Sequence, residues 1–277
     1  MKKILIIAGI VVVAGAIAWG VWSFILPHGQ PGGGVASSSY GSLPSVTVQT
    51  PGGASVLVRG VASPQDPVVA KDFLGQIQNA DQIALGGTVV ASPYALQIWG
   101  DENKGGEALL LNASSGWVLV SLGGGEWTAL ALIQEGVPHD AALQLVAGLG
   151  GTAPAGKSIS VPPGDTLTLG TAKGSVTMKN FYKNPVYLAD TQQSVVVRQD
   201  ASYAIVYDIP GNRFTLNLFG ASFGASRQTA EAGLLDVLGI NEQDACRLNV
   251  YESASGLLFA AHAGQSLTLS FCPSNLP

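Results

Sequence analysis

One stretch of the sequence has the residue types and spacing of a phosphate-binding loop. Residues 151–158 fit the pattern G-x-x-x-x-G-K-[ST] through Gly151, Gly156, Lys157 and Ser158. In such a loop the backbone N–H groups surround the phosphates, the lysine contacts the terminal phosphates, and the hydroxyl binds magnesium. The match would therefore support the binding of a nucleotide.

The residues around this motif argue against that function. A phosphate loop has to open a helix, because the helix N-terminus supplies part of the anion site. Here the following residues alternate apolar and polar and then reach Pro162 and Pro163, which a helix interior does not tolerate. The stretch 208–211 fits D-x-x-G but also a hairpin turn, and Glu242 stands where a base-reading lysine belongs. A phosphate-loop nucleotide-binding protein is kept only as an alternative.

The other residues that could do acid, base or metal chemistry are few. Three histidines are present, His28, His139 and His262, and none stands at a metal-ligand spacing from a cysteine. Asp101 lies in a polar turn, and Glu231 lies near the start of a predicted helix, where the helix dipole favours an acid. We recognise no serine, histidine and acid set. The sequence predicts no catalytic residue, no metal site and no cofactor.

An apolar run at the N-terminus predicts a membrane anchor. Residues 4–26 carry no charge, and at 1.5 Å per residue they span about 34 Å, enough for a hydrocarbon core of about 30 Å. Lys2 and Lys3 precede the run, so the N-terminus is expected to stay cytoplasmic. We predict a signal anchor whose partner is the lipid bilayer. The alternatives are a signal peptide cleaved after Ala18 and a buried helix.

Two cysteines, Cys246 and Cys272, follow in the part that such an anchor would place outside the cytoplasm. An even pair in an exported domain favours a disulfide, with two separate thiols as the alternative. The bridge would close a loop of about 27 residues, which the chain-entropy model values at roughly 3 to 4 kcal/mol.

The organisation of the chain follows from its glycine, proline and serine. The predicted segments are a cytoplasmic tip with anchor (1–28), a flexible linker (29–55), an α+β domain (56–149), a Gly-rich connector (150–157) and an α+β domain with the disulfide (158–277). Each domain is expected to be an antiparallel sheet with short helices at one end. The two domains share this order of elements, which leaves a true repeat open.

Apolar periodicity and turn residues predict the elements themselves. Strands are expected over 56–58, 88–92, 94–99, 108–111, 117–122, 158–161, 166–169, 175–181, 194–198, 203–207, 213–219, 248–251 and 267–271. Helices are expected over 68–80, 127–134, 140–146 and 227–238, with a short last helix capped by Asn241. Trp99 and Trp117 fall in strands, which favours the core over a ligand platform.

Charge excludes one class of partner. Charged residues make up 11% of the chain and the formal net charge is −5. Affinity for a phosphate backbone comes from clustered Lys and Arg, and no basic stripe is present. We therefore expect no nucleic acid partner.

The C-terminal third resembles membrane-anchored envelope proteins of small-genome bacteria that have no characterised function. The resemblance is carried by 180–182, Arg227 with 230–231, 238–240, 244–248 and 269–272. It implies a bacterial envelope setting and supports the disulfide. The function expected from the sequence is that of a single-pass, extracytoplasmic, non-catalytic binding or assembly module with an envelope protein as partner. An envelope hydrolase is the alternative.

Overall fold

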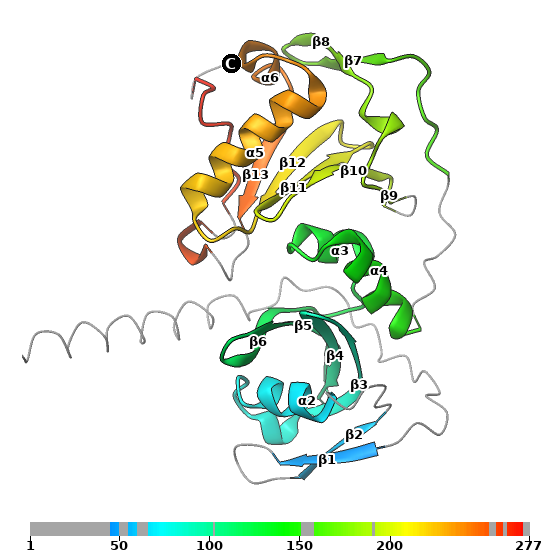
Figure 1. Cartoon of the computed structure of the whole chain (residues 1–277), viewed down its shortest axis with the longest axis vertical. Coiled ribbons are helices and arrows are strands. Elements are labelled where there is room, and N and C mark those ends of the chain that lie inside the picture. Colours follow the sequence, from blue (N-terminus) through cyan, green and yellow to red (C-terminus); the bar gives the residue numbers. More distant parts are fainter. Residues whose placement is uncertain are drawn as a thin grey trace, which may run out of the picture.

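The folded part of the chain is built from alternating layers of sheet and helix (Figure 1). The computed structural model describes residues 45–49, 55–59, 66–101, 103–150, 158–189, 192–254, 259–262 and 265–273. The predicted anchor, residues 4–26, lies outside the described residues. Within them, antiparallel sheets and short helices give an α+β fold, as the sequence predicts.

The elements fall into four sheets and five α-helices within the described residues. The first sheet pairs β1 (Ser45–Gln49) with β2 (Ser55–Arg59). The second has the order β3 (Ala84–Ala91), β4 (Tyr94–Gly100), β5 (Gly105–Ala113), β6 (Gly116–Leu122). The third sheet is a hairpin of β7 (Thr166–Thr171) and β8 (Gly174–Lys179). The largest has the order β13 (Val250–Ala254), β12 (Arg213–Leu218), β11 (Tyr203–Asp208), β10 (Ser194–Gln199), β9 (Tyr187–Ala189). The helices are α2 (Asp66–Leu74), α3 (Ala129–Gln134), α4 (His139–Gly148), α5 (Phe223–Leu238) and α6 (Glu242–Ala245).

Helix α2 covers one face of the β3–β6 sheet and also closes its edge. Val69, Phe73 and Leu74 are fully buried in a core that includes Trp99 and Trp117. Both tryptophans are therefore core residues, as their strand positions predict. The Gln76 side chain, just after α2, accepts from Leu119 N at 2.8 Å and donates to Trp117 O at 2.7 Å. One amide thus satisfies two outward backbone groups of edge strand β6, in the way a neighbouring strand would.

The centre of the largest sheet is buried on both faces. In β11, Tyr203, Ile205 and Tyr207 face the core under α5 and the β7–β8 hairpin. The alternate residues Ala204 and Val206 face a different core, formed with α3 and α4. Successive side chains of a strand point to opposite faces, so a doubly covered strand reads as a continuous apolar run.

The α3–α4 layer contacts both sheets. Leu132 and Leu145 share a buried cluster with Leu96 and Leu109 on one side and with Val206 on the other. The predicted division of the chain at 150–157 separates two sheets in sequence, while this layer joins their cores in space. The division into two domains stays a prediction.

Local signals set the ends of the C-terminal helices as expected. Gly239, with a φ of 63°, ends α5, and Ile240 N bonds back to Leu235 O at 3.1 Å. The Asn241 side chain then accepts from Asp244 N at 2.9 Å and caps α6.

The structure differs from the predicted elements in several places. Strand β1 lies within residues 29–55, which the sequence predicts as a flexible linker, α2 ends at Leu74 although the predicted helix covers 68–80, and β9 is a strand that the sequence does not predict. Strand β13 pairs parallel to β12, because α5 lies between them and carries the chain back across the sheet. Residues 158–161 form no strand: Ile159 is buried, but the prolines after it cannot donate to a ladder. Residues 267–271 form only one bridge, Leu267 to Glu252, because the next residues bond to side chains of α5.

Candidate functional site

One face of α5 carries residues that contact the C-terminal segment of the chain. Phe223, Arg227 and Glu231 are spaced by four, which places them on the same side of the helix. Phe223 stacks on His262 with ring centroids 3.8 Å apart, where the C-terminal segment first contacts α5. We call residues 265–273 the strap, because they lie over α5 and β13 beyond this point.

Two carboxylates and one arginine meet beneath the strap. Arg227 Nε lies 2.7 Å from Glu252 Oε2 and 3.5 Å from Glu231 Oε1. The Glu231 side chain is 7% exposed and that of Glu252 is fully buried. The contact to Glu252 is a close ion pair rather than a well-aligned hydrogen bond. Two acids therefore share a single cation in the protein interior.

This imbalance changes the protonation of Glu252. Burial raises the pKa of Glu252 to about 8, the neighbouring Glu231 carboxyl adds to the rise, and Arg227 opposes it. A carboxyl with this pKa is mostly protonated at neutral pH. The buried cluster then consists of one cation, one carboxylate and one neutral acid, so its charges balance.

The same three residues hold the strap. Glu231 accepts from Ser270 N, and its Oε2 accepts from Ser270 Oγ at 2.6 Å. Arg227 donates to the carbonyl oxygen of Thr268. The backbone of Glu252 exchanges two hydrogen bonds with Leu267, at 2.8 and 3.2 Å. The cluster is thus bonded to the chain's own backbone.

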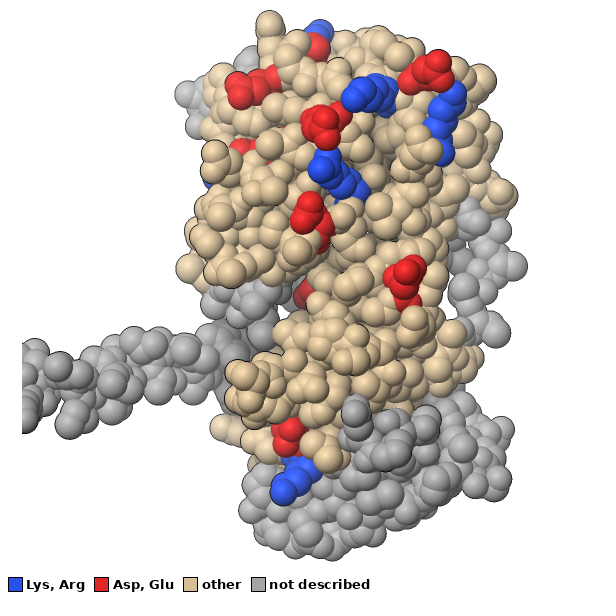
Figure 2. All heavy atoms as spheres, viewed as in Figure 1, with Lys and Arg blue, Asp and Glu red and all other residues tan. Residues whose placement is uncertain are grey.

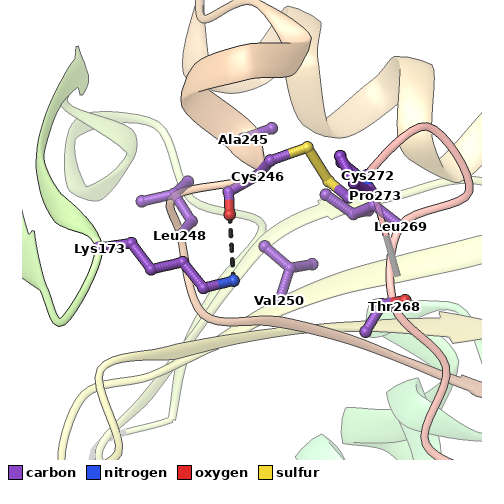
Figure 3. A pocket seen from close by; sticks show the side chains of 9 residues that line it. All are labelled: Lys173, Ala245, Cys246, Leu248, Val250, Thr268, Leu269, Cys272 and Pro273. Atoms are coloured by element: carbon purple, nitrogen blue, oxygen red, sulfur yellow. Dashed lines mark hydrogen bonds between the residues drawn. A yellow bond between two sulfur atoms is a disulfide. The ribbon is translucent and has the colours of Figure 1, made fainter. Parts of the chain in front are cut away.

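The disulfide fixes the far end of the strap. Cys246 at the end of α6 is bonded to Cys272, with Cα atoms 5.5 Å apart, which confirms the predicted bridge. A cavity of about 110 Å³ lies beside it (Figure 3). Its lining consists of Lys173, Ala245, Cys246, Leu248, Val250, Thr268, Leu269, Cys272 and Pro273. The Lys173 amine donates to Cys246 O at 3.3 Å, so the only charged group in the lining is bonded to backbone.

The phosphate-loop residues are placed only in part. Gly151, Gly156 and Lys157 lie outside the described residues, and Ser158 is exposed. The chain from Ser158 to β7 contains no helix, and the segment before the loop is helix α4 rather than a strand. Residues 208–213 form the β11–β12 hairpin turn, as the alternative interpretation of the D-x-x-G match predicts.

Of the other histidines and acids that the sequence singles out, Glu231 alone belongs to the buried cluster. His139 pairs with Asp140 at 3.0 Å, and Asp101 accepts from two backbone N–H groups of its own turn. His28 lies outside the described residues. Glu231 does not lie near the start of a helix, because α5 begins at Phe223; it belongs to the buried cluster instead.

Two features were not predicted from the sequence. The first is Glu252, whose signal is an acid at an inward position of the alternating strand β13. The second is Gly220-Ala221-Ser222-Phe223-Gly224, which fits the G-x-S-x-G nucleophile motif and runs from the β12–α5 connection into the first turn of α5. Ser222 has φ −139° and ψ 125°, ordinary extended backbone, whereas a nucleophile elbow is strained. Here Ser222 is the residue that precedes the helix.

The residues that the structure describes contain no group of three or more His, Cys, Asp or Glu side chains that could hold a metal ion. No helix in this part of the chain is long and apolar enough to cross a membrane. Neither a protein-family model, nor a curated protein, nor a solved structure matches the chain.

Proposed function

We propose that this chain is a single-pass, membrane-anchored protein of the bacterial cell envelope whose extracytoplasmic part is a non-catalytic binding or assembly module. The observation that carries the proposal is the Cys246–Cys272 disulfide, because disulfides persist in oxidising compartments. The apolar run 4–26 supplies the anchor, and Lys2 and Lys3 before it favour a cytoplasmic N-terminus.

The buried charged groups bond to the chain itself, which supports a non-catalytic role. Of the two acids in the buried cluster, Glu231 is the more exposed, and it accepts from the strap backbone at Ser270, while Arg227 donates to the carbonyl oxygen of Thr268. Glu252 is fully buried behind them. A catalytic acid or base has to reach a substrate proton, and here the reachable partners are the chain's own atoms.

The surface indicates what kind of partner such a module would bind. In the view of Figure 2 uncharged residues dominate, and the few charged side chains are scattered with both signs mixed. Several are already paired, such as Arg198 with Asp236 and Lys183 with Asp165. Recognition of a protein partner would then rest on polar and apolar contacts rather than on a charged patch.

The topology is tested by labelling a single exposed cysteine in intact cells. Thr168 on β7 is exposed, so Thr168→Cys offers a thiol, whereas both native cysteines are bonded to each other. A membrane-impermeant maleimide should label this variant without lysis, and the wild type serves as the unlabelled control. Labelling of Thr168→Cys only after lysis would place the folded part in the cytoplasm and refute the proposal.

The binding role is tested by photo-crosslinking from the same exposed strand in the native host. A specific envelope protein should be captured, and an excess of the unlabelled chain should compete for it. Turnover of a substrate by the purified chain, abolished by one acid or histidine substitution, would overturn the non-catalytic role.

A second candidate function is an envelope hydrolase, and the G-x-S-x-G match favours it. Ser222 is exposed at a strand-to-helix junction, and the next residue, Phe223, stacks on His262. A serine nucleophile activated by a base would react with a fluorophosphonate probe. Labelling that disappears in Ser222→Ala would establish the hydrolase, and an unlabelled wild type would exclude it.

A further inference from the structure

The strap is attached by one covalent bond and one set of buried polar contacts. We propose that residues 265–273 are a releasable strap: reduction of Cys246–Cys272 together with ionisation of Glu252 beside Glu231 detaches it from α5 and uncovers the outer edge of β13. Neither change alone is sufficient, because each leaves the other attachment in place. This inference does not depend on the proposed membrane location.

The non-covalent attachment depends on the number of charges beneath the strap. Among the described residues, α5 supplies the charged groups that contact the Glu252 carboxyl, namely Arg227 and Glu231. On β12 the residue paired with Glu252 is the apolar Leu216, and the strap supplies backbone groups. His262, a further titratable group on this face, stacks on Phe223. Two ionised carboxylates would leave one buried negative charge unpaired, and water entering under the opened strap would relieve it.

The covalent attachment is opened by thiol–disulfide exchange. The thiolate of an external dithiol attacks the sulfur of Cys272, which is partly exposed, and Cys246 leaves as a thiolate. The second thiol of the reductant then displaces Cys272. The dithiol is oxidised by two electrons, and both cysteines end as thiols after taking up its protons.

Release would expose backbone groups at the edge of the largest sheet. The backbone N–H and C=O of Glu252, now bonded to Leu267, would point outward from edge strand β13. The cavity lined by Leu248 and Val250 would open beside them.

The size of the pH effect follows from linkage. The pKa of Glu252 is about 8 with the strap in place and would return to about 4.5 in water. The closed form then binds one more proton between these values, so closing weakens as pH rises. Between pH 6 and pH 8 the opening equilibrium is expected to increase about 50-fold.

The test is backbone amide exchange of the full chain in detergent micelles, expressed as protection relative to the intrinsic rate at each pH. In reduced wild type, protection of Leu267 and Ser270 should be high at pH 6 and about 50-fold lower at pH 8. In the oxidised protein the protection of these two amides should stay high at both pH 6 and pH 8. In Glu252→Gln, and independently in Glu231→Gln, one cation faces one carboxylate, so the reduced protein should keep its protection at pH 8. Asp236→Asn, which removes an exposed acid from the same helix, is the control that should behave as wild type.

Three results would overturn the proposal. The first is protection in reduced wild type that does not change with pH. The second is loss of the strap on reduction at pH 6, which would show that the buried cluster contributes nothing. The third is a fall in protection between pH 6 and pH 8 in both reduced Gln variants that is as large as the fall in reduced wild type.

Discussion

Replacing Arg227 with methionine should destabilise the fold more than any other single charge substitution on α5. Methionine keeps the length and the helix propensity of the side chain. The change removes the only cation beside the Glu231 carboxyl, whose side chain is 7% exposed, and it removes the donor to Thr268. Breaking a buried ion pair in this way costs about 3 to 5 kcal/mol. For a folded part of this size, each kcal/mol lowers Tm by about 2 to 4 °C, which gives roughly 6 to 20 °C.

The assay is urea unfolding of wild type, Arg227→Met, Glu252→Gln and the double variant at pH 7. Because Arg227 and Glu252 are in direct contact, each single variant already disturbs the same interaction, so the cost of the double variant should be below the sum of the single costs by about 1 to 3 kcal/mol. The matched control is Arg198→Met. Arg198 also pairs with an acid of α5, Asp236, but the two side chains are 36% and 73% exposed. An exposed pair of this kind contributes at most about 1 kcal/mol.

Two outcomes would refute this reasoning. Equal costs for Arg227→Met and Arg198→Met would show that burial does not strengthen the Arg227 contacts. Additive single costs would show that Arg227 and Glu252 do not interact.

Three further predictions concern the whole fold. The free energy of unfolding of the wild type should fall by about 2 kcal/mol between pH 6 and pH 8, because the folded state holds the Glu252 proton and the unfolded state does not. A flat profile in urea unfolding at these pH values would contradict the pKa of about 8. Changing Cys246 and Cys272 together to serine should cost about 3.5 kcal/mol for a sequence separation of 26, measured against the oxidised wild type. An unchanged urea midpoint would mean that the bridge does not constrain the unfolded chain. Gln76→Ala should cost about 0.5 to 1.5 kcal/mol by removing the hydrogen bonds to two β6 backbone groups, and should increase the mass seen by light scattering as the edge pairs with other copies. A monomer of wild-type stability would rule out this role for Gln76.

Local signals in the sequence were sufficient for most of the C-terminal helices and hairpins. Gly239 ends α5 because its left-handed backbone suits glycine, and Asn241 caps α6 through its own side chain. The β7–β8 hairpin shows the alternation of buried and exposed residues that its letters predict. These features depend on neighbours within a few residues, so the sequence contains them directly.

These local signals do not determine how strands distant in the sequence pair. The letters of β13 predict a strand but do not say whether it pairs parallel or antiparallel, which the crossover through α5 decides. Residues 267–271 have an alternating pattern and still form no strand, because Arg227 and Glu231 take up their backbone groups. The α3–α4 layer could be predicted as two helices, but not as the filling between two sheets.

The sequence by itself determined the α+β class, the pairing of the only two cysteines and the apolar run that predicts an anchor, since each depends on composition or on short-range order. Only the tertiary structure brought Arg227 and Glu231 to Glu252, which follows about twenty residues later on a different element. An acid in a strand and an arginine on a helix have ordinary explanations when taken alone. Their meaning changes when packing removes water from both, because the interior then makes two carboxylates compete for one cation and one proton.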